Sequence, residues 1–127
     1  MAATAYDDIL NAALTELCTG TRIDVCATEP TTYAEATSTY TLGNYTITAG
    51  DGGGDWTIAD DGATGRKATL AAQSGNTATG TGAGNYIAVT DGAALLAVFD
   101  GDGDTVTSGQ EWTTGAADVL NLPNALT

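Results

Sequence analysis

Glycine-rich turns divide most of this sequence into short segments, and they restrict it to folds built from short elements. Seventeen of the 127 residues are glycine, and several stand beside aspartate, as in residues 51–55, 60–62 and 100–104. Glycine favours turns because it adopts backbone angles that other residues avoid, while the abundant threonine favours strands. After Gly20 the apolar residues change from helical spacing to alternation. We therefore expect a mainly β protein in which an N-terminal α-helix precedes a small antiparallel β-sandwich or Greek-key barrel.

The first segment has the pattern of an amphipathic helix over about residues 5–19. Thr4 is placed to cap its start, and Gly20 is placed to end it. Asp7 and Asp8 fall where the helix dipole favours negative charge. The apolar residues recur at spacings of three and four and form one stripe of Tyr6, Ile9, Leu10, Ala13, Leu14 and Leu17. We expect this helix to pack on its own domain; docking on a neighbouring subunit as an N-terminal anchor is the alternative.

The β region is expected to span about residues 22–123, and residues 1–127 are expected to form a single domain. The clearest hairpin joins residues 85–90 to residues 94–99 through Asp91-Gly92. A bulge is expected near Gly43, and a loop is expected over residues 29–36. Further strands are predicted at residues 22–27, 40–49, 56–58, 66–72, 105–107 and 119–122, around Trp112, and weakly near Thr79.

Charge is the strongest compositional signal. Sixteen acidic residues face only Arg22, Arg66 and Lys67, so the formal net charge is −13. Nucleic-acid binding needs Lys and Arg to displace counterions from phosphates. This surface would instead repel DNA and anionic membranes. We therefore expect neither a nucleic-acid partner nor a membrane partner.

Cys18 and Cys26 are the only cysteines. No basic start followed by a long apolar run precedes them, so we expect synthesis in a reducing cytoplasm, with both thiols free and buried. A disulfide between them is the alternative. Their spacing fits no zinc motif, and the sequence contains no histidine.

The absence of histidine also removes the usual base that activates a Ser or Cys nucleophile. Ser38, Ser74 and Ser108 lie in turn-like sequence without a basic neighbour, and the paired carboxylates of Asp60-Asp61 lie in a glycine turn. We therefore expect no enzymatic activity, no catalytic residue and no cofactor. A glycosidase-like carboxylate pair is the alternative that the sequence leaves open, although nothing nearby indicates a sugar-binding cleft.

One acidic segment has the ligand spacing of a calcium loop. Counted from Asp100, acidic residues fall at positions one, three, five and twelve, which are Asp100, Asp102, Asp104 and Glu111. Position six is Thr105 where an EF-hand needs glycine, and the flanking sequence predicts strands where an EF-hand has helices. We expect an acidic turn and no metal site; a calcium ion is the alternative.

A set of motifs runs through most of the chain, from the helix to Pro123. They are residues 22–26, 29–36 and 42–43, Asp61-Gly62 with Gly65-Arg66-Lys67, and residues 80–82, 86–91, 95–97 and 106–109. Together they resemble a family of small virion structural proteins of tailed bacteriophages and prophages. Such families include capsid decoration subunits and tail or fibre components, and the family pattern supplies no catalytic residues.

The resemblance implies a capsid decoration (cement) protein on the outer surface of the phage head. Its expected partners are the major capsid protein and neighbouring copies of itself, with no small-molecule substrate. The alternative is a tail or fibre module that binds a host receptor or glycan. A trimeric fibre should carry long repeats or a coiled-coil stalk, and the sequence has neither.

Overall fold

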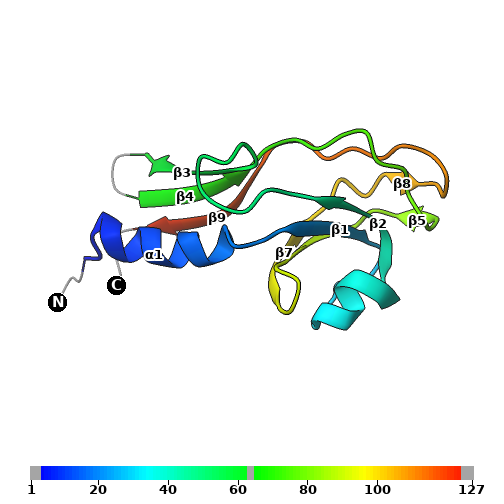
Figure 1. The fold of residues 1–127 in the computed structure, drawn as a ribbon, viewed down its shortest axis with the longest axis horizontal. Coiled ribbons are helices and arrows are strands. Elements are labelled where there is room, and N and C mark those ends of the chain that lie inside the picture. The colour runs from blue at the N-terminus through cyan, green and yellow to red at the C-terminus, as the bar shows by residue number, and fades with distance from the viewer. Residues whose placement is uncertain (1–3, 63–64, 124–127) are drawn as a thin grey trace. The chain divides into compact units, whose positions relative to one another are not determined.

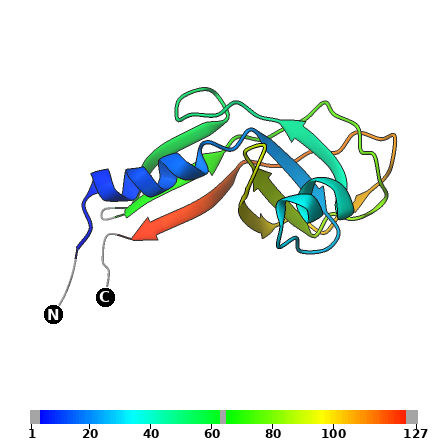
Figure 2. The same cartoon turned by 60° about the horizontal axis from the view of Figure 1, so that its bottom comes forward.

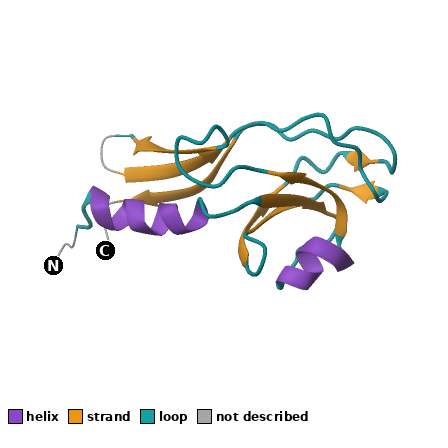
Figure 3. Ribbon diagram, viewed as in Figure 1, coloured by secondary structure: helices purple, strands orange, loops and turns teal. Residues whose placement is uncertain are grey.

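The structure is a computed structural model that describes residues 4–62 and 65–123. The chain forms two compact units. Unit 1 comprises Met1–Thr19, Thr48–Ala71 and Ala116–Thr127, and unit 2 comprises Gly20–Ile47 and Ala72–Gly115. All pairings between the named strands are antiparallel. The predicted mainly β fold, with an N-terminal helix followed by antiparallel sheets, is therefore confirmed (Figure 3). That residues 1–127 make a single domain stays a prediction.

Unit 1 is a helix on a sheet. Helix α1 (Asp7–Leu17) runs along a three-stranded sheet with the order β3 (Trp56–Asp61), β4 (Gly65–Leu70) and β9 (Ala117–Pro123) (Figures 1 and 2). The apolar residues that lie between the two layers are buried: Leu10, Leu14 and Leu17 of the helix, and Trp56, Ala68 and Leu70 of the sheet. Burial of these side chains is the main source of stability for such a layered pair.

Helix α1 is shorter than its sequence pattern predicted. It begins at Asp7, with Tyr6 at the N-cap position and no side-chain cap, so the prediction that Thr4 caps the helix was wrong. The capping position lies two residues beyond Thr4. At the other end the Thr19 hydroxyl donates to the carbonyl of Glu16 over 2.7 Å, and this bond satisfies one of the carbonyls left open by the last turn.

Unit 2 contains a four-stranded sheet with the order β2 (Thr41–Thr46), β1 (Arg22–Cys26), β6 (Tyr86–Thr90) and β7 (Leu95–Asp100). A second sheet pairs β5 (Gly82–Ala83) with β8 (Thr105–Val106). The predicted β6–β7 hairpin is confirmed. Its turn is held by the Asp91 carboxylate, which accepts the backbone amides of Ala93 and Ala94 over 3.0 and 2.8 Å, and by Gly92 at φ +97°.

The predicted bulge near Gly43 is also confirmed. Val25 of β1 pairs with Gly43 of β2, but its neighbour Cys26 pairs with Thr41, so Leu42 has no partner on β1. One extra residue on β2 bends the strand locally. The Leu42 carbonyl instead accepts the backbone amides of Thr79 and Gly80 over 2.8 and 3.0 Å.

Two segments differ from the sequence prediction. The predicted loop over residues 29–36 ends in a short helix, η1 (Glu35–Thr39), in which the Tyr40 amide donates to the carbonyl of Glu35, five residues earlier. The predicted strand around Trp112 is absent from the described chain. Residues 111–114 make only isolated bridges, Thr77 with Glu111 and Gln73 with Thr114.

Trp112 instead packs against β2 of unit 2. Its ring lies 4.6 Å from the ring of Tyr45, centre to centre, and the Tyr45 hydroxyl donates to the Trp112 carbonyl. Gly43 provides the space for the indole: a Cβ at this position would lie 2.6 Å from Trp112 Nε1 and 3.2 Å from the Cα of Ala78. The bulged strand therefore needs a residue without a side chain at this point.

We expect Gly43→Ala to destabilise the protein by about 1–3 kcal/mol, because the added methyl group forces the buried indole to move within a packed interior. Urea unfolding followed by circular dichroism measures the change. Gly115→Ala is the matched control, since a Cβ there meets no atom within 4 Å. Equal stability of the two variants would show that the indole does not limit residue 43.

Candidate functional site

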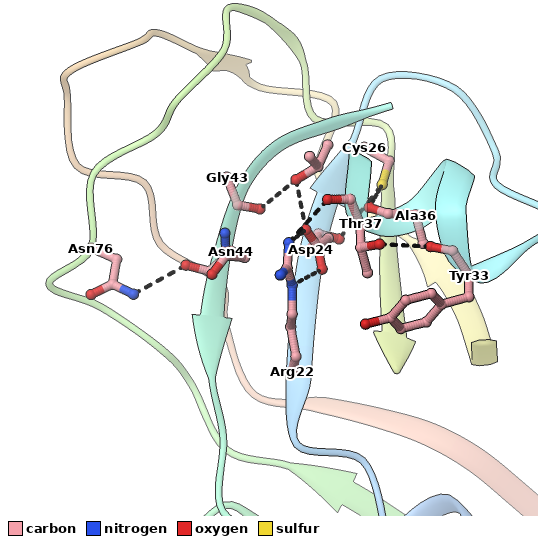
Figure 4. A network of polar contacts seen from close by, with 10 residues as sticks. Arg22, Asp24, Cys26, Tyr33, Ala36, Thr37, Gly43, Asn44 and Asn76 are labelled. Carbon is pink, nitrogen blue, oxygen red and sulfur yellow. Dashed lines mark hydrogen bonds and ion pairs between the residues drawn. The ribbon is translucent and has the colours of Figure 1, made fainter. Parts of the chain in front are cut away.

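A buried carboxylate lies at the centre of unit 2. Asp24, in the middle of β1, has an exposed side-chain fraction of 0%. Its Oδ1 accepts a hydrogen bond from Arg22 Nε over 2.7 Å (Figure 4). Its Oδ2 accepts two more, from Arg22 Nη2 and from the Thr41 hydroxyl, both over 2.7 Å. Three donors therefore surround the carboxylate, as a buried charge requires.

Arg22 connects this carboxylate to helix η1. Its Nη2 also donates to the Thr37 carbonyl over 3.2 Å, and the Thr37 hydroxyl donates to the Tyr33 carbonyl over 2.9 Å. The hydrogen bond with Asp24 raises the pKa of Arg22 above its ordinary value. Because every Asp24 bond goes to a neighbouring protein group, we interpret the cluster as a clamp that fixes η1 on the sheet.

The two thiols are free and buried, as predicted. Cys18 follows α1 in unit 1, and Cys26 ends β1 in unit 2. Burial, with the Asp51 carboxylate adding to it, raises the pKa of Cys18 to about 11. Burial, with Asp24 adding to it, raises the pKa of Cys26 to about 12. Both shifts keep the thiols protonated and therefore unreactive.

We expect neither thiol of the native protein to react with a disulfide reagent such as Ellman's reagent at pH 8, because only roughly one Cys18 in a thousand, and fewer Cys26, would be ionised. In urea both should react, giving two thiols per chain. Rapid labelling of the native protein would contradict the burial. Denatured protein that needs a reductant before it labels would show the alternative disulfide.

The structure separates the other candidate residues. Adjacent residues on a strand point to opposite faces, so Asp60 pairs with Arg66 over 2.5 Å while Asp61 accepts a hydrogen bond from Asn121. The three serines are exposed at three separate places: Ser38 in η1, Ser74 before Gly75, and Ser108 after β8.

The acidic segment with calcium-loop spacing does not form a ligand group. Asp100 ends β7, and the Asp104 carbonyl accepts the Gly84 amide. The Glu111 carboxylate accepts the Gly75 amide over 3.1 Å. Across residues 4–62 and 65–123, no three Cys, Asp or Glu side chains are grouped closely enough to hold a metal ion.

The clearest candidate for a binding function is an apolar surface on unit 1. Among the described residues, the large hydrophobic side chains that are exposed are Tyr6 (78%), Ile9 (67%) and Leu120 (37%). Tyr6 and Ile9 belong to the predicted helix stripe, of which only Leu10, Leu14 and Leu17 are buried. Ala13 continues the exposed flank at helical spacing.

Strand register places Leu120 on the same side of the sheet as the helix. Leu120 pairs with Ala68 and Leu122 pairs with Arg66, and directly paired residues point to the same face. Arg66 Nε donates to Asn11 of α1 over 2.9 Å, so this is the face that α1 covers. Helix α1 packs mainly on β4 and β3. On the same face, Leu120 of β9 is exposed and Leu122 is half-buried. We name Tyr6, Ile9, Ala13, Leu120 and Leu122 the α1–β9 surface.

The charges of the protein as a whole are one-sided, with a formal net charge of −13. Each of the three side-chain cations is held in an ion pair: Arg22 with Asp24, Arg66 with Asp60, and Lys67 with Asp118. The Thr69 hydroxyl and the Lys67 ammonium both donate hydrogen bonds to Asp118 and lower its pKa. Sixteen acidic residues outnumber the three side-chain cations, so the protein carries a large excess of negative charge. The protein presents apolar contacts within a strongly negative surface.

Neither the protein-family models, nor the curated proteins, nor the solved structures gave a match to this chain. Within the part of the chain that the structure describes, no helix has the length and apolar character needed to cross a bilayer.

Proposed function

We propose that this chain is a structural protein of a phage virion, a decoration (cement) subunit that binds the major capsid protein on the outside of the head. The observation that carries the proposal is the α1–β9 surface. Exposed apolar patches on an otherwise charged protein are typical of surfaces that bind another protein. Tyrosine often contributes much of the binding energy at such contacts, and Tyr6 is the most exposed large side chain of this surface.

The charge of the protein supports an exterior position. A net charge of −13 repels packaged DNA, so a position inside the shell is electrostatically unfavourable for the protein. On the outside, the same charge opposes aggregation of free subunits before they bind. The sequence resemblance to small virion proteins points in the same direction.

Adhesion is the proposed mechanism. Each copy contributes a modest apolar contact to a capsid subunit, and the symmetric shell repeats that contact many times. A subunit that bridges two capsid proteins adds to the work needed to separate them. The shell then withstands the pressure of packaged DNA better than it does without the bridges.

The test is to mix the purified protein with capsids that lack it and to image them by electron cryo-microscopy. We expect density at repeated lattice positions on the outer surface. Empty lattice positions would contradict the proposal. Stoichiometry in the purified virion is the second measurement: hundreds of copies per particle support the capsid, whereas a few to a dozen copies indicate a tail or fibre component.

A further inference from the structure

Strand β7 forms a free edge of the four-stranded sheet in unit 2. The sheet order places it beside β6 alone. Among the described residues, no backbone bridge or backbone hydrogen bond joins residues 95–99 to any segment other than β6. The outward amides and carbonyls of β7 are thus available to another strand.

The side chains of this edge strand are apolar up to its last residue, Asp100. Leu95, Leu96, Ala97, Val98 and Phe99 follow one another without a polar residue, and all five are half-buried. Leu95 and Val98 pack against the small cluster of Cys26, Ala36 and Ala88 on one face. Ala97 and Phe99 pair with Val89 and Ile87 and so share the opposite face. Both faces of the edge strand can contact an added strand.

The other edges of the two larger sheets are protected against such pairing. The outer edge of β2 is covered where the Leu42 carbonyl accepts two amides of residues 79–80 and the Asn44 carbonyl accepts the Asn76 side chain. On β3 the Ile58 amide donates to the Asp51 carboxylate over 2.9 Å. Strand β9 carries Asp118 and ends at Pro123. Charges, prolines and covering loops are the usual protection of edge strands. Strand β7 has only the irregularity at Leu96 and, as its last residue, the charged Asp100.

Acidic residues flank the open edge at both ends. Asp91 precedes β7, and Asp100, Asp102 and Asp104 end or follow it, the last three exposed. A second copy paired antiparallel on β7 would bring Asp91 of each copy near Asp100 of the other, which is unfavourable. A strand with Lys or Arg at its ends would instead meet opposite charge.

We propose that the β7 edge binds an extended segment of a partner protein, an apolar strand flanked by basic residues, which joins the sheet by backbone hydrogen bonds. The partner strand would extend the sheet to five strands. Its apolar side chains would cover the half-buried residues of β7, and its basic ends would face Asp91 and Asp100. This contact is separate from the α1–β9 surface and does not depend on the proposed function.

The test uses two synthetic peptides in which valine and threonine alternate, one ending in lysine pairs and the other in glutamate pairs. Hydrogen exchange followed by NMR reports each amide of β7. We expect the lysine peptide to slow the outward amides of residues 95–99 by about tenfold or more and the glutamate peptide to bind about tenfold more weakly. Equal binding of both peptides, or unchanged exchange on β7, would overturn the inference.

Leu96→Lys places a charge on the edge, and we expect it to weaken binding of the lysine peptide roughly tenfold. Thr57→Lys adds the same charge at an exposed position of β3 in unit 1 and should leave binding nearly unchanged. If Leu96→Lys does not fold, the exchange experiment on the unchanged protein still decides the question.

Protection of the β7 amides from hydrogen exchange that rises with protein concentration, without peptide, would show that β7 pairs with a second copy and would overturn the proposal. Binding of the lysine peptide without any binding to capsids would refute only the decoration function.

Discussion

Asp24→Ala is expected to destabilise the protein by about 3 kcal/mol. The substitution leaves the Arg22 guanidinium without its carboxylate and deprives the half-buried Thr41 hydroxyl of its closest acceptor. Breaking a buried ion pair typically costs about 3–5 kcal/mol. The Arg22 side chain is 32% exposed, so water partly replaces the lost partner and the lower end of that range applies. Urea unfolding followed by circular dichroism gives the free energy.

The control for this prediction removes both charges. Arg22→Met with Asp24→Leu leaves no buried charge unpaired, and we expect the double variant to lose much less stability than Asp24→Ala. Asp24→Asn keeps the shape of the side chain but weakens the two hydrogen bonds from Arg22. We expect its loss of stability to lie between those of Asp24→Ala and the double variant. If the free energy of unfolding of Asp24→Ala lay within about 1 kcal/mol of that of the unchanged protein, the Arg22–Asp24–Thr41 cluster would not be a major source of stability.

Local chemistry explains which parts of the fold could be predicted. The β6–β7 hairpin follows from its turn: Asp91 binds two amides within three residues, and Gly92 takes an angle that only glycine accepts readily. The bulge at Gly43 follows from a change of alternation within one strand. Such signals lie within a few residues of the structure they determine.

The α-helical turn at residues 33–34, which leads into η1, had a local signal as well. Thr32 and Glu35 have the spacing of a capping box: the Thr32 hydroxyl accepts the Glu35 amide over 3.2 Å, and the Glu35 carboxylate accepts the Thr31 amide over 2.7 Å. The same bonds from Thr31 lower the pKa of Glu35. Interpreting residues 29–36 as a loop gave Pro30 too much weight and this capping pattern too little.

The buried state of Asp24 and the exposed state of Ile9 had no local signal. The alternation of Ile23 and Val25 with polar residues along β1 does not indicate that Asp24 is buried. Helix η1 lies over the Asp24 face, and its residues are eleven or more positions away in sequence. The stripe of α1 is wider than the part of the sheet that it covers. The flank of α1 that stays exposed depends on the sheet beneath the helix, whose last strand, β9, follows about a hundred residues later. The candidate surface therefore required the structure.

Replacing Tyr6 and Ile9 together with serine is expected to weaken binding to undecorated capsids by about a hundredfold. Both side chains are mostly exposed, so their loss removes apolar contact area without opening the buried row of Leu10, Leu14 and Leu17. Interface side chains of this kind contribute roughly 1–2 kcal/mol each, and tenfold in affinity corresponds to about 1.4 kcal/mol. Co-sedimentation with capsids over a range of protein concentrations measures the change.

The matched control changes the opposite, polar flank of the same helix. Ala12 and Thr15 are also exposed, and Ala12→Ser with Thr15→Ser should leave both capsid binding and the unfolding midpoint close to those of the unchanged protein. If the Tyr6 and Ile9 variant bound capsids as well as this control, the α1–β9 surface could not be the capsid contact. Weak binding together with a lowered unfolding midpoint would instead show that Tyr6 and Ile9 stabilise unit 1, because a pure contact role changes affinity alone.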